Sequence, residues 1–223
     1  KAISTFEKLE KIAEKPTNRF DAQYNLMELY FMNKNFDAAF KYAELILASE
    51  KLDAQLMEEV KLIKAKIDFT RENYDSAIST YEEVSKYANK RGAEAKYMVA
   101  KIRYLKGNYK GCEEMVYKLV NQVPSYPKWI GKAFILLADN FLAQDDAFNA
   151  KVTLQSVIDN ADDEELIQIA KEKLNIIIKT EKEEQSKERK KAPEIELIEN
   201  DSKDEKLFNE QTQAEKQEGK DEK

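Results

Sequence analysis

The feature that most constrains the fold of this chain is a set of small residues that recurs at nearly regular intervals. Neighbouring members of the set lie 37, 38, 35 and 38 residues apart. A bulkier or apolar residue follows each small residue after four positions, and another follows three positions later. Positions i, i+4 and i+7 share one face of an α-helix, so each copy predicts a helix with a buried face. The small residues are Ala2, Ala39, Ala77, Cys112 and Ala150.

A second helix precedes the first in each copy. Twelve positions before the last four small residues lie Met27, Ala65, Ala100 and Ala138, in stretches with the same apolar spacing. Short polar breaks such as Gly107-Asn108 separate the two stretches. A single helical pair cannot bury its apolar face, whereas stacked pairs bury a continuous core. We therefore predict an all-α fold of stacked helix–turn–helix units in which the small residues, Cys112 included, permit close helix packing.

Composition excludes most catalytic chemistry. The 223 residues contain no histidine, one cysteine and five glycines. These counts exclude Ser-His-Asp and Cys-His catalysis, intrachain disulfides and the usual zinc sites, and no glycine-rich phosphate loop is present. We expect no enzymatic activity, no metal and no cofactor. The acidic pairs Asp145-Asp146 and Asp162-Asp163 stand at predicted helix starts, where capping explains them, and Asp162-x-x-Glu165 resembles a capping box.

The charge is concentrated at one end of the sequence. Residues 192–223 carry 11 acidic side chains and five lysines, which accounts for the whole net charge of −6, so the rest is balanced. A neutral body with an acidic segment is poorly suited to nucleic acid or anionic membranes. No apolar run is long enough to cross a bilayer, so we expect no membrane insertion. Low hydrophobicity and net charge predict disorder in residues 192–223.

The repeated motif resembles the tetratricopeptide repeat (TPR) family. The spacing of Ala100, Gly107, Tyr109 and Cys112 matches that motif, and three further copies match in part. The sequence departs from the family pattern at Asp68 and Arg103, where an aromatic residue is usual, and its intervals exceed the usual length. The resemblance implies a right-handed α-solenoid, here with a C-terminal capping helix, and it is strongest to envelope arrays of Bacteroides-type bacteria.

The resemblance also implies a division of the chain. We expect about four and a half repeats in residues 1–161, of which 1–18 form the second helix of a truncated repeat. A capping helix with a charged extension then covers 162–191, and the acidic tail covers 192–223. Because the first copy lacks its first helix, we expect the C-terminal part of a longer array. The compartment stays open between the periplasm or outer membrane and the cytoplasm. The complete repeats are expected at 20–57, 58–92, 93–130 and 131–161.

In TPR arrays the first helices line a concave groove, and this geometry implies a set of binding residues. Two rows of apolar or aromatic side chains flank a row of mixed charges, which suits a peptide or helix of another protein. Alternatively the aromatics pack between neighbouring first helices, a reading that weighs equally for two of them, Phe69 and Tyr104. The candidates are Tyr24, Glu28, Phe31, Leu62, Lys66, Phe69, Tyr97, Lys101, Tyr104 and Asp139.

The sequence favours a non-catalytic scaffold that binds another protein or peptide, and the resemblance implies a role in assembly of the bacterial envelope. The main alternative is a structural module, such as an oligomerisation spacer whose oligomeric state the sequence does not give. RNA binding by a related helical repeat is disfavoured because the expected groove has no row of basic residues. It also lacks the asparagines of the TPR version that grips acidic peptide ends, since Glu28 and Asp139 occupy two of its central positions.

Overall fold

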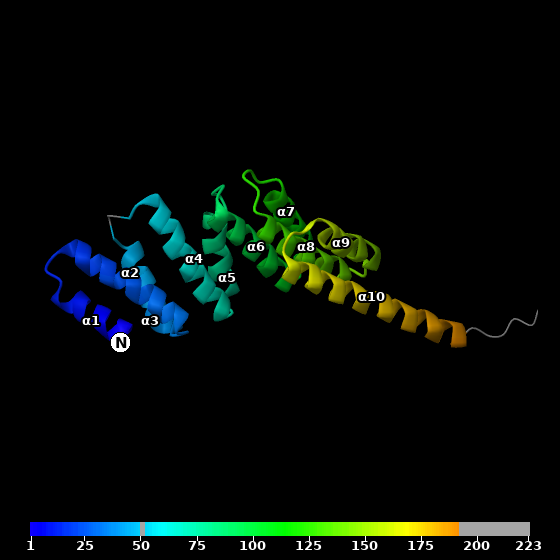
Figure 1. Cartoon of the computed structure of the whole chain (residues 1–223), viewed down its shortest axis with the longest axis horizontal. Helices are drawn as coiled ribbons and strands as arrows, with labels where there is room; N and C mark the ends of the chain where they lie inside the picture. Colours follow the sequence, from blue (N-terminus) through cyan, green and yellow to red (C-terminus); the bar gives the residue numbers. More distant parts are fainter. Residues whose placement is uncertain (50–51, 192–223) are drawn as a thin grey trace, which may run out of the picture. The chain divides into compact units, whose positions relative to one another are not determined.

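The computed structural model describes residues 1–49 and 52–191, and in these residues the chain forms ten helices and no strand (Figure 1). The all-α prediction is therefore confirmed. Side chains are described through Lys187. The helices are α1 Ala2–Ile12, α2 Pro16–Met32, α3 Phe36–Leu47, α4 Ala54–Thr70, α5 Tyr74–Val84, α6 Lys90–Leu105, α7 Tyr109–Val120, α8 Pro127–Leu142, α9 Ala147–Asn160 and α10 Glu164–Lys191.

Consecutive helices pack against each other as pairs. The most extensive contacts join α2 to α3, α4 to α5, α6 to α7 and α8 to α9, and smaller contacts join each pair to the next. The first helices of neighbouring pairs also touch, α4 with α6 and α6 with α8. The members of a pair are close because the connecting turns are short.

The repeated small residues lie where these pairs close. Ala39, Ala77, Cys112 and Ala150, on α3, α5, α7 and α9, are completely buried. The residues twelve positions earlier, on α2, α4, α6 and α8, are completely buried as well. Ala2 of α1 differs because it is exposed. The sequence period therefore places one small residue at each of four helix–helix contacts, where a larger side chain would separate the helices.

The turn inside each pair has the same backbone conformation. Lys34, Glu72, Gly107 and Asp145 each adopt a positive φ, between 59° and 72°. Each is followed by an asparagine or aspartate at the N-cap of the next helix, and three of these four side chains accept a backbone N–H of that helix. The left-handed residue ends the first helix and the cap starts the second, so the turn is compact.

Three buried clusters form the core. One joins α2, α3 and α4 around Met27, Ile46 and Val60. The largest extends from α4 to α8 and contains Tyr81, Val99 and other side chains of α5 to α7. The third joins α8, α9 and the first half of α10. Its members on α10 are Leu166, Ala170 and Ile177, and its members on α8 and α9 are Ile135, Ala138, Ala150, Leu154 and Val157.

The start of α10 corrects one prediction. The N-cap is Asp163, whose Oδ1 accepts hydrogen bonds from the backbone N–H groups of Glu165 at 3.2 Å and Leu166 at 3.4 Å. The predicted capping box placed the cap at Asp162, which was one position too early. The error has a simple physical origin, because two adjacent aspartates are equally good caps and tertiary contact selects between them. Lys128 of α8 lies 3.1 Å from Asp163 and provides that contact.

The structure divides into two units, Lys1–Ile178 and Lys179–Lys223. The first contains α1 to α9 and the first half of α10. In the second, the described part is the end of α10, which is largely exposed and carries an ion pair of 4.0 Å between Lys179 and Glu183. The acidic segment 192–223 that was predicted to be disordered lies outside the described residues. None of the described helices has the length and apolar character needed to span a bilayer.

Candidate functional site

The ten predicted binding residues lie on the first helices of the four pairs, α2, α4, α6 and α8. Nine of them are partly buried, and the tenth, Leu62, is only 5% exposed. Partial burial means that each side chain contacts a neighbour and keeps some surface for a partner. The contacts described below connect these helices one after another through their side chains.

A hydrogen-bonded group of side chains joins α2, α4 and α6. The hydroxyl of Tyr24 on α2 lies 2.7 Å from Glu59 of α4 and 3.2 Å from Glu28 of its own helix. Glu59 also accepts a hydrogen bond from Arg91 of α6, at 2.5 Å. Burial and the two nearby carboxylates raise the pKa of Tyr24 well above its ordinary value. Tyr24 therefore stays protonated and acts as a hydrogen-bond donor.

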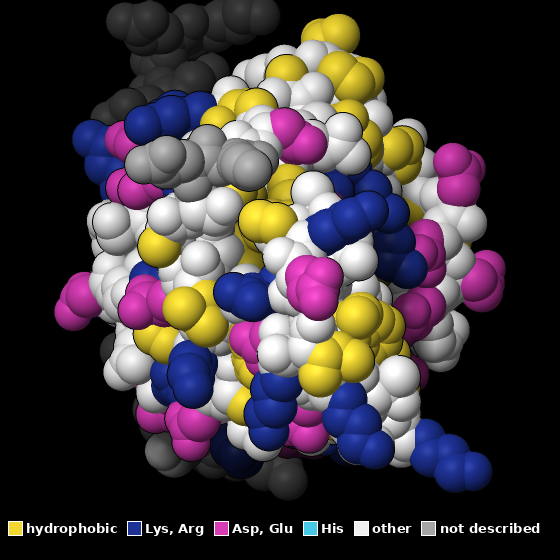
Figure 2. Space-filling view, turned by 90° about the vertical axis from the view of Figure 1, so that its left-hand side faces the viewer, with side chains coloured by type: hydrophobic (Ala, Val, Ile, Leu, Met, Phe, Trp, Pro, Cys, Tyr) yellow, Lys and Arg dark blue, Asp and Glu magenta, His cyan; other side chains and the backbone are white. Residues whose placement is uncertain are grey.

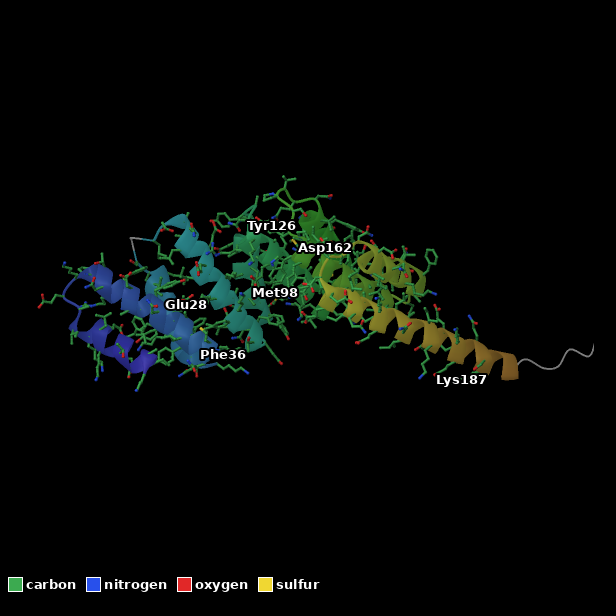
Figure 3. All side chains as sticks on the ribbon, viewed as in Figure 1. Glu28, Phe36, Met98, Tyr126, Asp162 and Lys187 are labelled. Atoms are coloured by element: carbon green, nitrogen blue, oxygen red, sulfur yellow. The ribbon has the colours of Figure 1, made fainter. Side chains whose placement is uncertain are left out.

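The same three helices enclose a hollow of about 560 Å³, which we call the α2–α4–α6 hollow. It brings together four of the predicted residues, two apolar and two charged, with residues of α6 that were not predicted. Glu28 is labelled on α2 in Figure 3. The lining residues are Glu28, Phe31, Met32, Glu59, Leu62, Ile63, Lys66, Asn89, Lys90, Arg91 and Glu94.

The charges in this hollow are balanced and partly paired. Lys66 of α4 lies 2.7 Å from Glu94 of α6, and Arg91 pairs with Glu59. Among the described residues no ion pair is formed by Glu28 or by Lys90, the first residue of α6. The apolar part of the lining includes Met32, whose exposed fraction is 76%. The hollow therefore combines fixed charges with apolar surface open to solvent.

The remaining predicted aromatics pack more closely. Phe69 of α4 lies against Tyr74, with ring centroids 5.6 Å apart, and the Lys101 ammonium of α6 lies 5.3 Å from the Phe69 centroid. Tyr104 lies 6.2 Å from Tyr109 in the same way. For Phe69 and Tyr104, packing and partner binding were equally weighted predictions. Each ring therefore has an aromatic partner within its own pair, and Phe69 also contacts Lys101 of the next pair.

Tyr97 of α6 contacts Trp129 of α8 at a centroid distance of 5.6 Å. Burial, followed by the charge of Asp139, raises the pKa of Tyr97. Trp129 lies in the first turn of α8, and the Lys132 ammonium lies 4.9 Å from its ring. Asp139, the last predicted residue, pairs with Lys173 of α10 at 2.6 Å. Tyr97 and Asp139 thus extend the chain of contacts from α6 through α8 to α10.

Sequence reasoning missed the charged residues that tie these helices together, chiefly Glu59, Arg91 and Glu94. A signal was available for two of them. Glu59 and Glu94 lie three positions before the predicted residues Leu62 and Tyr97, so they share a helix face with them. Arg91 has no such spacing from a predicted residue. Its place beside Glu59 follows from its being the second residue of α6, and the sequence pattern did not locate the start of that helix.

Two other hollows have similar volumes and contain none of the predicted residues. One, of about 600 Å³, lies near the start of α2 and includes Arg19 and Ser49. The other, of about 610 Å³, lies beside α3, where Lys64 and Arg71 each lie 5.0 Å from the ring centroid of Phe40. Figure 2 shows the face at the α1 end, where small hydrophobic groups alternate with side chains of both charges. No large patch of one sign is visible there.

Reactive groups are scarce in the part of the chain that the structure describes. Cys112 is completely buried, and burial raises the pKa of its thiol to about 12. A protonated, enclosed thiol is a poor nucleophile and a poor metal ligand. No cluster of three or more acidic or cysteine side chains capable of holding a metal ion occurs in these residues.

Comparison with known proteins adds a likeness of fold. No protein-family model matches the sequence, and the search of curated proteins found no match. Among solved structures, the chain is similar to BtubC (BKLC) from P. vanneervenii, with a TM-score of 0.62. The match covers 80% of this chain and 82% of that chain, at 14% sequence identity. At this level of identity the likeness concerns the fold alone.

Proposed function

We propose that this chain is a non-catalytic scaffold that binds a peptide or helix of another protein along the face formed by α2, α4, α6 and α8. In this proposal the helical pairs α2–α3, α4–α5, α6–α7 and α8–α9 are TPR-like repeats, stacked as a right-handed α-solenoid. The repeat starts expected at 20, 58, 93 and 131 lie three or four residues inside first helices that begin at Pro16, Ala54, Lys90 and Pro127. The first helices then line the concave side of the solenoid, and α10 covers the last pair. The packing of consecutive helices and the contacts between neighbouring first helices support this arrangement.

The observation that carries the proposal is the α2–α4–α6 hollow. It combines apolar side chains, such as Phe31 and the exposed Met32, with fixed charges on three different helices. Its volume of about 560 Å³ falls in the range of pockets that hold a few side chains or a small ligand. A mixed apolar and charged surface of this kind suits a protein partner, because apolar anchors supply affinity and charges supply specificity.

A selection from a random peptide library tests the proposal. We expect the full chain to enrich peptides that bind it, and that binding is lost in a variant with Glu28→Lys, Lys66→Glu and Lys101→Glu. A matched control carries Lys41→Glu, Glu114→Lys and Lys118→Glu, three exposed positions on α3 and α7. Circular-dichroism melting checks that both variants fold. Failure to enrich any peptide, or equal loss of binding in the control, contradicts the proposal.

A structural module that associates with copies of itself is the second candidate. Phe148 and Val152 favour it, because they lie four positions apart on α9 and are 71% and 53% exposed. Residues four positions apart share one helix face, so a second copy that packs on this face would bury both side chains. Light scattering at several protein concentrations separates the candidates. A mass that rises with concentration, and returns to that of one chain in a Phe148→Ser variant, supports self-association.

A further inference from the structure

The partner chemistry of the α2–α4–α6 hollow follows from which of its charges are already satisfied. Glu59 receives hydrogen bonds from Tyr24 and from Arg91, and Glu94 pairs with Lys66. Within residues 1–49 and 52–187, the one side-chain donor to Glu28 is the Tyr24 hydroxyl at 3.2 Å. That hydroxyl carries a single proton and lies closer to Glu59, at 2.7 Å. The proton is therefore directed to Glu59, which leaves Glu28 as the carboxylate with unused acceptor capacity.

We propose that this hollow binds a peptide segment that presents a lysine or arginine to Glu28 and an adjacent aliphatic side chain to Phe31, Leu62 and Ile63. This inference rests on the proposed function and adds the chemical class of the partner. The carboxylate and the apolar residues line the same hollow, so one short segment reaches both. A charged hydrogen bond between the partner cation and Glu28 would supply the specificity.

The local charge favours a cation over an anion. Burial and then the two neighbouring carboxylates raise the pKa of Tyr24. The hollow as a whole is balanced in charge, and among the described residues Glu28 is its carboxylate that forms no ion pair. An acidic ligand would have to compete for Lys66 and Arg91, which Glu94 and Glu59 already neutralise. Lys90, which forms no ion pair with the residues that the structure describes, lies in the first turn of α6 and is exposed.

The apolar surface explains why a bare cation is not sufficient. Met32 is 76% exposed and Phe31 is partly buried, so the hollow presents apolar area to solvent next to Glu28. Burying that area favours an aliphatic group on the ligand. A lysine or arginine followed by leucine, isoleucine or methionine therefore matches both halves of the hollow.

An array of 12-residue peptides with the full chain tests this assignment. The central residue is lysine, arginine, glutamine or glutamate, and the neighbouring residue is leucine, isoleucine, methionine or serine. We expect the lysine and arginine members with an aliphatic neighbour to bind at least about tenfold more tightly than the glutamine and glutamate members, as expected for one charge-assisted hydrogen bond. Glu28→Gln should remove this preference, and Glu28→Lys should reverse it towards glutamate.

Glu114→Lys is the matched control, because it makes the same charge change at an exposed position on α7. It should retain the preference for cationic peptides. Equal binding of the glutamine or glutamate members, a preference unchanged in Glu28→Gln, or no binding by any member overturns the cationic assignment. The random-library selection decides separately whether the proposed function stands.

Discussion

The carboxylate of Asp68 on α4 accepts a hydrogen bond of 2.7 Å from the hydroxyl of Ser76 on α5, although only 2% of Asp68 is exposed. In the next pair, Arg103 of α6 donates to the backbone carbonyl of Gly111 on α7, at 3.1 Å and over the same interval of eight residues. In both pairs a polar link therefore joins the two helices of the pair.

Removal of the Ser76 hydroxyl tests this link. Ser76→Ala leaves a buried carboxylate without its side-chain donor, so we expect the free energy of unfolding to fall by about 1–3 kcal/mol. Urea denaturation followed by circular dichroism measures it. Ser79→Ala, at an exposed position of the same helix, serves as the control and should change the stability by less than about 0.5 kcal/mol. Equal effects of both changes would show that the link contributes nothing specific.

Tyr81 has a completely buried ring, and its hydroxyl has no hydrogen-bond partner among the described residues. Tyr81→Phe removes an unsatisfied polar atom and keeps the ring, so we expect unchanged or slightly higher stability, by up to about 1 kcal/mol. Tyr81→Ala leaves a large cavity and should cost about 3–5 kcal/mol. Thermal and urea unfolding of the two variants measure the contrast. A strongly destabilised Tyr81→Phe would instead reveal a hydrogen bond to this hydroxyl.

Cys112 should be unreactive in the folded protein. Burial raises the pKa of its thiol to about 12, above the ordinary value of 9.0. The neutral thiol is thus favoured in the folded state. The free energy of unfolding should therefore fall as the pH rises from 9.0 towards the raised pKa of Cys112. At pH 8 we expect a thiol reagent such as DTNB to label the denatured chain rapidly and the native chain at least about a hundredfold more slowly. Rapid labelling of the native chain contradicts this assignment.

Gly92, the third residue of α6, lies against the preceding turn. A Cβ atom at this position would lie 1.9 Å from the backbone carbonyl oxygen of Tyr87. Although alanine is the better helix former, we expect Gly92→Ala to cost about 1–3 kcal/mol because backbone atoms must move. At Gly131 the nearest atom is the end of the flexible Leu166 side chain, at 2.8 Å, so Gly131→Ala should cost less. Chemical denaturation of both variants gives the comparison.

The cap of α10 gives a pH-dependent prediction. The ion pair with Lys128 is the main cause that lowers the pKa of Asp163 below its ordinary value of 3.8, and backbone N–H groups of α10 lower it further. Because the pKa of Asp163 is lowered, its carboxylate stabilises the folded state fully at a pH above 3.8. This stabilisation is lost as the pH falls through the lowered pKa. Asp163→Ala should therefore reduce the melting temperature at pH 7 and reduce it by less at pH 2. Asp162→Ala should have little effect at either pH.

The sequence predicted the helices because its periodicity is physically strong. Two apolar stretches per copy can be buried only as packed helices, and a residue such as Ala77 at a helix contact has to be small. The candidate site was harder to predict. The order of charged residues along a helix does not show which of them form ion pairs with the next helix. The ion pairs between Glu59 and Arg91 and between Lys66 and Glu94 could therefore be identified only from the structure. The TPR assignment, the solenoid and the function stay predictions.

The side-chain links that join α2 to α4 and α8 to α10 connect residues that lie close together in the sequence. Tyr24 and Glu59 are 35 residues apart, and Asp139 and Lys173 are 34 apart. Contacts between residues with so small a sequence separation can form before distant parts of the chain have folded. A small sequence separation favours rapid folding. For the same reason, we expect the loss of one contact to destabilise only the neighbouring helices. Removing one of these hydrogen bonds should cause local unfolding of the adjoining helical pair. Amide hydrogen exchange should then rise first in that pair, while the far end of Lys1–Ile178 remains protected.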